Sequence, residues 1–209
     1  MMAEPKYKPA ERYNALYALG VTEEILKTAI LLGELERDNC TLHDPLCVPG
    51  IFAWSRCSRS VRDQLVPLGW TSVNDQNRAL VVSPNGRVAI AAVSGDENTG
   101  NENLSPNLKI PAGSATKRAV NANQPTLFQM HPTRDEVAAG GKRQTWLLLR
   151  RPTADFIYAE LSLPAAMVDG KVVGWLERII LEPIPHEFTF AANPDADFAE
   201  IDIPIRKRQ

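Results

Sequence analysis

Residues 78–93, RALVVSPNGRVAIAAV, contain two short apolar runs joined by a turn sequence. Both runs are rich in the residues that favour β-strands. The intervening Ser83–Gly86 has proline at its second position and glycine at its fourth, which suits a type I turn followed by a left-handed residue. The segment therefore predicts a β-hairpin with strands at residues 78–82 and 87–93.

The chain before this hairpin has the apolar spacing of helices. We predict helices at residues 9–19, about 22–37 and roughly 52–66, with Thr22 as the N-cap of the second. Residues 38–50 are expected to be a loop, because Pro45 and Pro49 interrupt them. In the second helix the apolar positions at spacings of three and four are Ile25, Leu26, Ala29, Leu32 and Leu35.

The third predicted helix has a narrow apolar stripe and an opposite basic side. The stripe is formed by Trp54, Cys57, Val61 and Leu65. Because a core helix must bury its apolar arc, we expect these four residues to be buried and Arg56 and Arg59 to be exposed.

The chain after the hairpin is predicted to contain a long polar loop and then strands. Residues 94–124 are rich in Gly, Asn, Ser and Pro and have little periodicity, so we expect a loop that is mobile unless a partner orders it. Strands are predicted at residues 145–150, 155–163 and 171–181, with weaker edge strands within 187–205.

The two longest of these strands are predicted to pair through a turn at Asp169-Gly170, with residue numbers that sum to about 339. This register puts Glu160 and Glu177 on one face, together with Tyr158 and Trp175. That face is too apolar to be simply hydrated, so we expect it to pack against another element or to line a site. The core face would carry Ile157, Ala159, Leu161, Leu163, Val172, Leu176 and Ile180.

These segments predict an α+β fold, in which N-terminal helices and a β-hairpin precede a mainly antiparallel C-terminal sheet. The predicted regions are a helical region with a hairpin at 1–93, a polar loop at 94–124 and a sheet region at 125–209. A winged-helix-like unit is one interpretation of residues 1–93, and one continuous domain over all three regions is the alternative. Among the 209 residues, 23 Lys and Arg nearly balance 25 Asp and Glu, so no global field attracts nucleic acid. No apolar run is long enough to span a membrane, and three cysteines without a signal-like N-terminus favour the cytoplasm.

A zinc site is the first candidate for chemistry. Cys40, His43, Cys47 and Cys57 fall within one short stretch, and three thiolates with one imidazole are a suitable tetrahedral set. Their spacing matches no common zinc module, and Cys57 belongs to the apolar stripe, where a thiol needs no function. We therefore expect no resident cofactor, with zinc or Mg²⁺ as the alternative.

A nucleic-acid surface is the second candidate. A helix that carries Arg56, Arg59 and Arg62 precedes a hairpin that carries Arg87, which is the order of elements in a winged-helix unit. The alternative is a hydrated helix face next to an ordinary hairpin, where Asp63 cancels part of the charge.

A set of carboxylates is the third candidate. Asp96, Glu97 and Glu102 follow a predicted strand, and Glu160 and Glu177 share a face in the predicted register. Paired carboxylates can bind Mg²⁺ or act as an acid and a base. Glutamates on a half-buried sheet more often pair with arginine, and Arg150, Arg151 and Arg178 are available.

These candidates favour a non-enzymatic binding protein over an enzyme. The expected partner is nucleic acid or another protein, and the alternative is a metal-dependent hydrolase or nuclease that uses the carboxylates. A binding protein needs an exposed charged or apolar patch, whereas an enzyme needs a pocket where carboxylates converge. The three-dimensional arrangement of these residues distinguishes the two.

Overall fold

The computed structural model describes residues 9–76, 78–123 and 143–186. It confirms the predicted α+β class. The helices are α1 (Pro9–Ala18), α2 (Glu23–Asp38), α3 (Val48–Leu65), a 3₁₀ turn (Val66–Leu68) and α4 (Ser114–Asn121). The strands are β1 (Thr71–Asp75), β2 (Arg78–Val82), β3 (Val88–Ser94), β4 (Gln144–Pro152), β5 (Phe156–Pro164), β6 (Met167–Val168), β7 (Lys171–Val172), β8 (Trp175–Ile180) and β9 (Ile184–Pro185).

One mixed sheet runs through the described part of the chain. Its strand order is β1-β2-β3-β4-β5-β8, and β9 also pairs with β5. All of these neighbours are antiparallel except β3 and β4, which are parallel. Because β3 pairs with β4 along its whole length, the strands of the N-terminal hairpin belong to the same sheet as the C-terminal strands.

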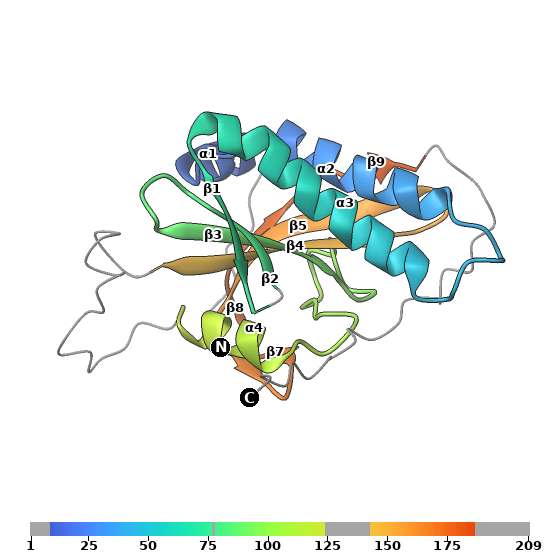
Figure 1. The fold of residues 1–209 in the computed structure, drawn as a ribbon. Helices are drawn as coiled ribbons and strands as arrows, with labels where there is room; N and C mark the ends of the chain where they lie inside the picture. Colours follow the sequence, from blue (N-terminus) through green and yellow to red (C-terminus); the bar gives the residue numbers. More distant parts are fainter. Residues whose placement is uncertain (1–8, 77, 124–142, 187–209) are drawn as a thin grey trace, which may run out of the picture.

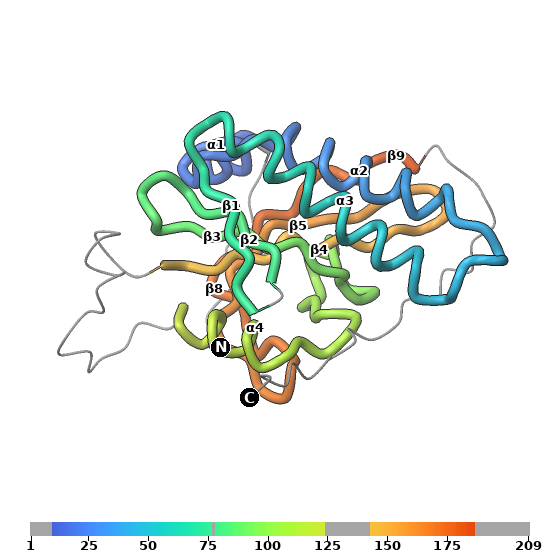
Figure 2. Tube along the Cα trace, viewed as in Figure 1, coloured from blue at the N-terminus to red at the C-terminus, as the bar shows by residue number. Residues whose placement is uncertain are grey.

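Both faces of this sheet are covered. Helices α2 and α3 lie side by side across one face, while α4 and the β6–β7 hairpin lie on the opposite side (Figure 1). Figure 2 traces the same path, with the segment between β3 and α4 running below the sheet. This second face therefore packs against other elements, which is one of the two predictions made for it. The buried residues of its core are Leu108, Val120, Leu147, Leu149, Met167, Val172 and Trp175.

The helical hairpin formed by α2 and α3 follows the sequence in most respects. The Thr22 side chain accepts a hydrogen bond from the Ile25 N–H at 3.2 Å, as expected of an N-cap. Helix α3 begins at Val48, within the segment that we expected to be a loop. Pro49 lies in the first turn of α3, where a backbone N–H has no acceptor within the helix. Because proline loses nothing there, it is compatible with the start of the helix.

The prediction that the apolar stripe of α3 is buried was partly wrong. Cys57, Val61 and Leu65 are buried, but Trp54 is 39% exposed. Helix α3 packs against α2 as well as the sheet, and its buried arc extends to Ala53 on the α2 side. Trp54 lies two turns before the buried Val61 on the same side of the helix, so its exposure reflects its place in the N-terminal half of α3. A Cβ atom placed on Gly33 of α2 would lie only 2.6 Å from the Ala53 carbonyl oxygen, so glycine permits this close helix contact.

The hairpin of β2 and β3 is confirmed. The Ser83–Gly86 turn ends with Gly86 at φ 70°, and the Ser83 hydroxyl accepts a hydrogen bond from the Val88 N–H at 2.9 Å. Strand β1 was not expected, because its sequence, TSVND, is polar. It lies at the edge of the sheet and is largely exposed, so its side chains need not be apolar.

The predicted pairing of the C-terminal strands was wrong by one residue. Strand β5 pairs with β8 so that Ser162 lies opposite Arg178, and the numbers sum to 340 until a bulge after Leu163. Because successive side chains alternate between faces, this shift moves Ile179 to the helix side of the sheet. It also separates Glu177 from Glu160 and brings Arg178 to the face that carries Glu160.

Residues 94–123 are not simply a polar loop. They contain α4, and an isolated bridge joins Gly95 to Leu108. The edge strands predicted within residues 187–205 lie outside the described residues. Within the described part of the chain, no helix combines the length and apolar character that crossing a bilayer requires.

Candidate functional site

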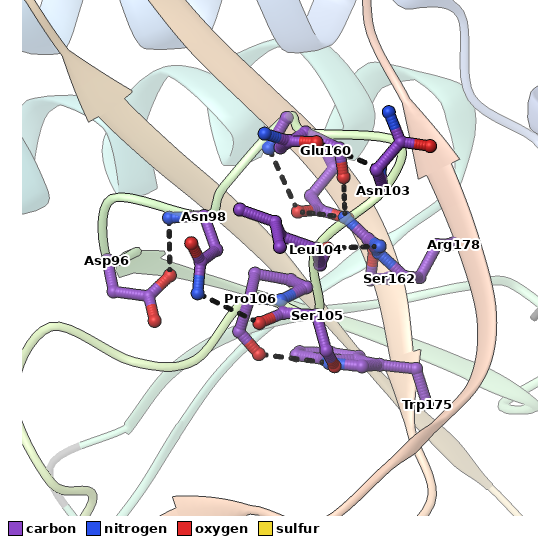
Figure 3. Close-up of polar contacts among 12 residues, drawn as sticks. Asp96, Asn98, Asn103, Leu104, Ser105, Pro106, Glu160, Ser162, Trp175 and Arg178 are labelled. Carbon is purple, nitrogen blue, oxygen red and sulfur yellow. Dashed lines mark hydrogen bonds and ion pairs between the residues drawn. The ribbon is translucent and has the colours of Figure 1, made fainter.

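The most deeply buried polar group on the second face of the sheet is an ion pair. Arg178 binds both carboxylate oxygens of Glu160, through Nε at 2.7 Å and Nη2 at 3.1 Å. The Ser162 hydroxyl donates to Glu160 Oε2 at 2.9 Å, and the Gly100 N–H donates to Oε1 at 3.1 Å. Glu160 is 0% exposed and Arg178 is 2% exposed. The carboxylate of Glu160 is therefore fully engaged by neighbouring donors (Figure 3).

The same arginine holds the segment that follows β3. Arg178 donates to the carbonyl oxygens of Leu104 at 2.9 Å and Asn101 at 3.1 Å. A second anchor is Trp175, whose Nε1 donates to the Pro106 carbonyl at 3.1 Å. These contacts fasten residues 100–106 to β5 and β8.

Two glycines allow this segment to turn tightly over the sheet. A Cβ atom on Gly95 would lie 2.0 Å from Thr99 Oγ1. Gly100 has φ 76°, and a Cβ there would lie 2.9 Å from Tyr158 Cβ. Close packing therefore explains the two glycines of the sequence SGDENTG at residues 94–100.

The other candidate carboxylates do not gather around Glu160. Asp96 Oδ1 accepts the Asn98 N–H at 3.1 Å within its own turn, and Glu97 and Glu102 are exposed. Glu177 pairs with Leu163 and so lies on the opposite face of the sheet. Among the described residues, no group of three or more His, Cys, Asp and Glu side chains is arranged to hold a metal ion.

The four zinc candidates occupy separate environments. Cys57 is buried in the interface between α2 and α3, and burial raises the pKa of its thiol to about 12. The Cys40 thiol donates to the Glu36 carbonyl at 3.6 Å, and desolvation raises its pKa as well. Cys47 is the N-cap of α3, and His43 is exposed in the preceding loop.

The burial of Cys57 gives a prediction about thiol reactivity. Because the thiolate is the reactive form, Cys57 should resist iodoacetamide in the native protein at pH 8, while Cys47, which is partly exposed, is alkylated. Both should react in denaturant, and mass spectrometry of tryptic peptides measures the difference. Equal modification of Cys57 and Cys47 in the native protein would contradict the buried position.

The candidate basic residues also lie in different environments. Arg62 is turned onto the sheet, where it donates to the Val73 carbonyl at 2.7 Å and the Leu80 carbonyl at 3.2 Å, and burial lowers its pKa. Arg59 pairs with Asp63 at 3.2 Å on the exposed face. Arg56 also remains 41% exposed there, 3.9 Å from Glu36. Arg62 therefore serves the fold, and two arginines remain on the outer face of α3.

Arg87 does not belong to α3. It follows the Ser83–Gly86 turn and is exposed. Because Arg62 bonds to backbone carbonyls of the sheet, the four arginines do not form one exposed cluster.

A region that the sequence did not reveal lies in the half of the helical hairpin that adjoins the loop between α2 and α3. Large apolar side chains remain exposed there, from 38% for Leu31 to 86% for Leu42. We call it the α2–α3 apolar surface, and it is formed by Leu31, Leu32, Leu42, Leu46, Ile51, Phe52 and Trp54. The sequence did contain one indication of these exposed residues. The apolar residues of this stretch occupy a wider arc of each helix than packing on one sheet can bury.

Comparison of the chain with protein-family models, curated proteins and solved structures finds no match.

Proposed function

We propose that this chain is a protein-binding protein and that the α2–α3 apolar surface is its contact surface. The observation that carries the proposal is the concentration of seven exposed large apolar side chains in one half of one helical hairpin and its loop. Exposed apolar side chains gathered in one region of a protein often mark sites of protein–protein contact. Phe52 and Trp54 also belong to the residue types that are enriched in the centres of interfaces.

The surroundings of this surface support the same proposal. Charged side chains of both signs flank it, with Arg56 facing Glu36 on the outer side of the two helices. An apolar centre with a mixed polar rim is the usual composition of a protein interface. A cytoplasmic location is part of the proposal, and three free cysteine thiols support it.

An enzymatic role has less support from the geometry. Glu160, the most buried of the candidate carboxylates, is neutralised by Arg178, and Asp96 is used in a local turn. Among the described residues, no group of three or more His, Cys, Asp and Glu side chains could hold a metal ion, which leaves metal-dependent chemistry without a site there.

Site-specific photo-cross-linking in cells tests the proposal. A photoreactive phenylalanine analogue at position 52 is expected to give a discrete cross-linked protein product. The same group at Val173, which is 55% exposed away from α2 and α3, is expected to give none. The product at position 52 should also disappear when Leu46 is replaced by aspartate, because a charge in the interface centre must be desolvated.

Two results would count against protein binding. Equal products from positions 52 and 173 would indicate non-specific contact. Products that contain nucleic acid, that weaken steeply with added salt and that are lost in Arg56→Ala/Arg59→Ala would favour the nucleic-acid alternative.

A further inference from the structure

We infer that His186 forms a proton-dependent clasp that holds β9 against the end of α2 and loosens as the pH rises. The His186 clasp consists of three residues that are far apart in the chain. Asp38 is the last residue of α2, Thr153 lies between β4 and β5, and His186 directly follows β9. The inference does not depend on the proposed protein-binding function.

Both nitrogens of the His186 ring face an acceptor. Nδ1 lies 2.6 Å from the Thr153 carbonyl oxygen, and Nε2 lies 2.9 Å from Asp38 Oδ2. Because a carbonyl oxygen only accepts, Nδ1 carries a proton. A neutral ring would then turn the lone pair of Nε2 toward a carboxylate, whereas the imidazolium donates from both nitrogens. The two contacts therefore favour the protonated ring.

The position of the clasp strengthens this preference. The side chains of His186 and Asp38 are only 11% and 8% exposed, so water does little to stabilise the carboxylate. The His186 ring is the ion-pair partner of that carboxylate within the described residues. Asp38 also ends α2, where the helix dipole favours a positive charge.

The other titratable groups on these elements leave the clasp carboxylate as the charge next to the ring. Arg37 of α2 lies 3.9 Å from Glu34, and Arg150 of β4 pairs with the same glutamate. Cys40 stays a neutral thiol, because burial raises its pKa. Asp155, whose carbonyl accepts the backbone N–H of the clasp histidine at 2.9 Å, is acidic and exposed. These surroundings favour a positive ring.

A clasp that needs this proton depends on pH. A histidine released into water has a pKa of about 6.5, so above that pH the closed clasp binds one more proton than the open state. Raising the pH therefore favours opening, and the opening equilibrium constant increases by up to about tenfold per pH unit. Below about pH 6.5 both states hold the proton, and the dependence disappears. Opening frees β9 from β5, where Ile184 pairs with Ile157.

Native-state hydrogen exchange of the purified full chain tests this inference. The measured quantity is the protection factor of the His186 amide, which corrects for the pH dependence of intrinsic exchange. From about pH 6.5 to 8.5 it is expected to fall by up to about tenfold per unit. In Asp38→Asn it should stay constant, because an asparagine amide donates to the neutral ring. The matched control, Asp155→Asn, changes an exposed carboxylate and should keep the wild-type dependence.

The nitrogen-15 chemical shifts of the His186 ring give a second measurement, which a purely structural contact would not change. At about pH 7, both nitrogens should be protonated in the wild type and only Nδ1 in Asp38→Asn. Circular dichroism checks that each variant is folded, and if Asp38→Asn is not, the wild-type ring shifts decide. An unprotonated Nε2 in the wild type, a protection factor independent of pH, or the same loss of pH dependence in Asp155→Asn would overturn the inference.

Discussion

Replacing Arg178 with alanine is expected to lower the free energy of unfolding by about 3–5 kcal/mol. The substitution leaves the Glu160 carboxylate at 0% exposure without its cation. It also removes the donor to the Leu104 and Asn101 carbonyls, and buried polar groups without a partner are costly. Equilibrium unfolding in urea measures the change.

The matched control is Arg59→Ala. Arg59 also pairs with a carboxylate, Asp63, but the two side chains are 67% and 64% exposed. Water screens such a pair, so the expected loss is below about 1 kcal/mol. Similar losses from Arg178→Ala and Arg59→Ala would contradict the structural importance of the buried pair.

The Arg178 variant should also loosen residues 100–106. This segment is fastened to the sheet by Arg178 and, through Pro106, by Trp175. With one anchor lost, limited proteolysis should cut within the segment at protein concentrations and times that leave the wild-type chain intact. Unchanged proteolysis together with lower stability would indicate that Trp175 alone is a sufficient anchor.

The sequence was most informative where a short segment determines its own conformation. The Ser83–Gly86 turn and the Thr22 N-cap depend on hydrogen bonds within a few residues, and both were predicted correctly. The register between β5 and β8 depends instead on a bulge at Leu163, which the alternation of side chains does not reveal. Local patterns therefore predicted the elements, but not the pairing between distant ones.

This single error in register changed the candidate site. The expected register placed Glu177 on the face of Glu160, which suggested a pair of carboxylates. The observed register places Arg178 there, which produces a neutral buried ion pair. A shift of one residue exchanges the two faces of a strand, so it converts a candidate active site into a structural anchor.

The exposed surface was missed for a different reason. A helical wheel shows which residues share an arc, but not which neighbours cover that arc. Trp54 lies on the same side of α3 as the buried Val61, two turns earlier, so its exposure reflects its place in the N-terminal half of the helix. Tertiary packing thus decides whether an apolar residue is in the core or on a contact surface.

The second buried ion pair, between Glu34 of α2 and Arg150 of β4, is expected to respond differently to substitution. Each side chain is only 1% exposed, so Glu34→Leu should cost about 3–5 kcal/mol by leaving the Arg150 charge buried. Unlike Glu160, Glu34 has one oxygen, Oε2, that accepts no hydrogen bond within the described residues. That oxygen lies 3.9 Å from Nε of Arg37.

Because this pair is incompletely satisfied, two apolar side chains of similar volume should replace it well. We expect Glu34→Leu/Arg150→Leu to recover the loss and to unfold within about 1 kcal/mol of the wild-type chain, or to be more stable. The corresponding Glu160→Leu/Arg178→Leu variant should remain destabilised, because the Gly100 N–H and the Leu104 carbonyl would lose their partners.

Urea unfolding of the four single leucine variants and both double variants completes a double-mutant cycle at each site and measures the two coupling energies. The expected result is recovery in the helix-side pair and none in the pair that anchors residues 100–106. Recovery at both sites would show that the backbone contacts of Arg178 contribute little. Recovery at neither site would show that α2 depends on the Glu34–Arg150 pair for its position on the sheet, because two leucines would then fail to hold the helix there.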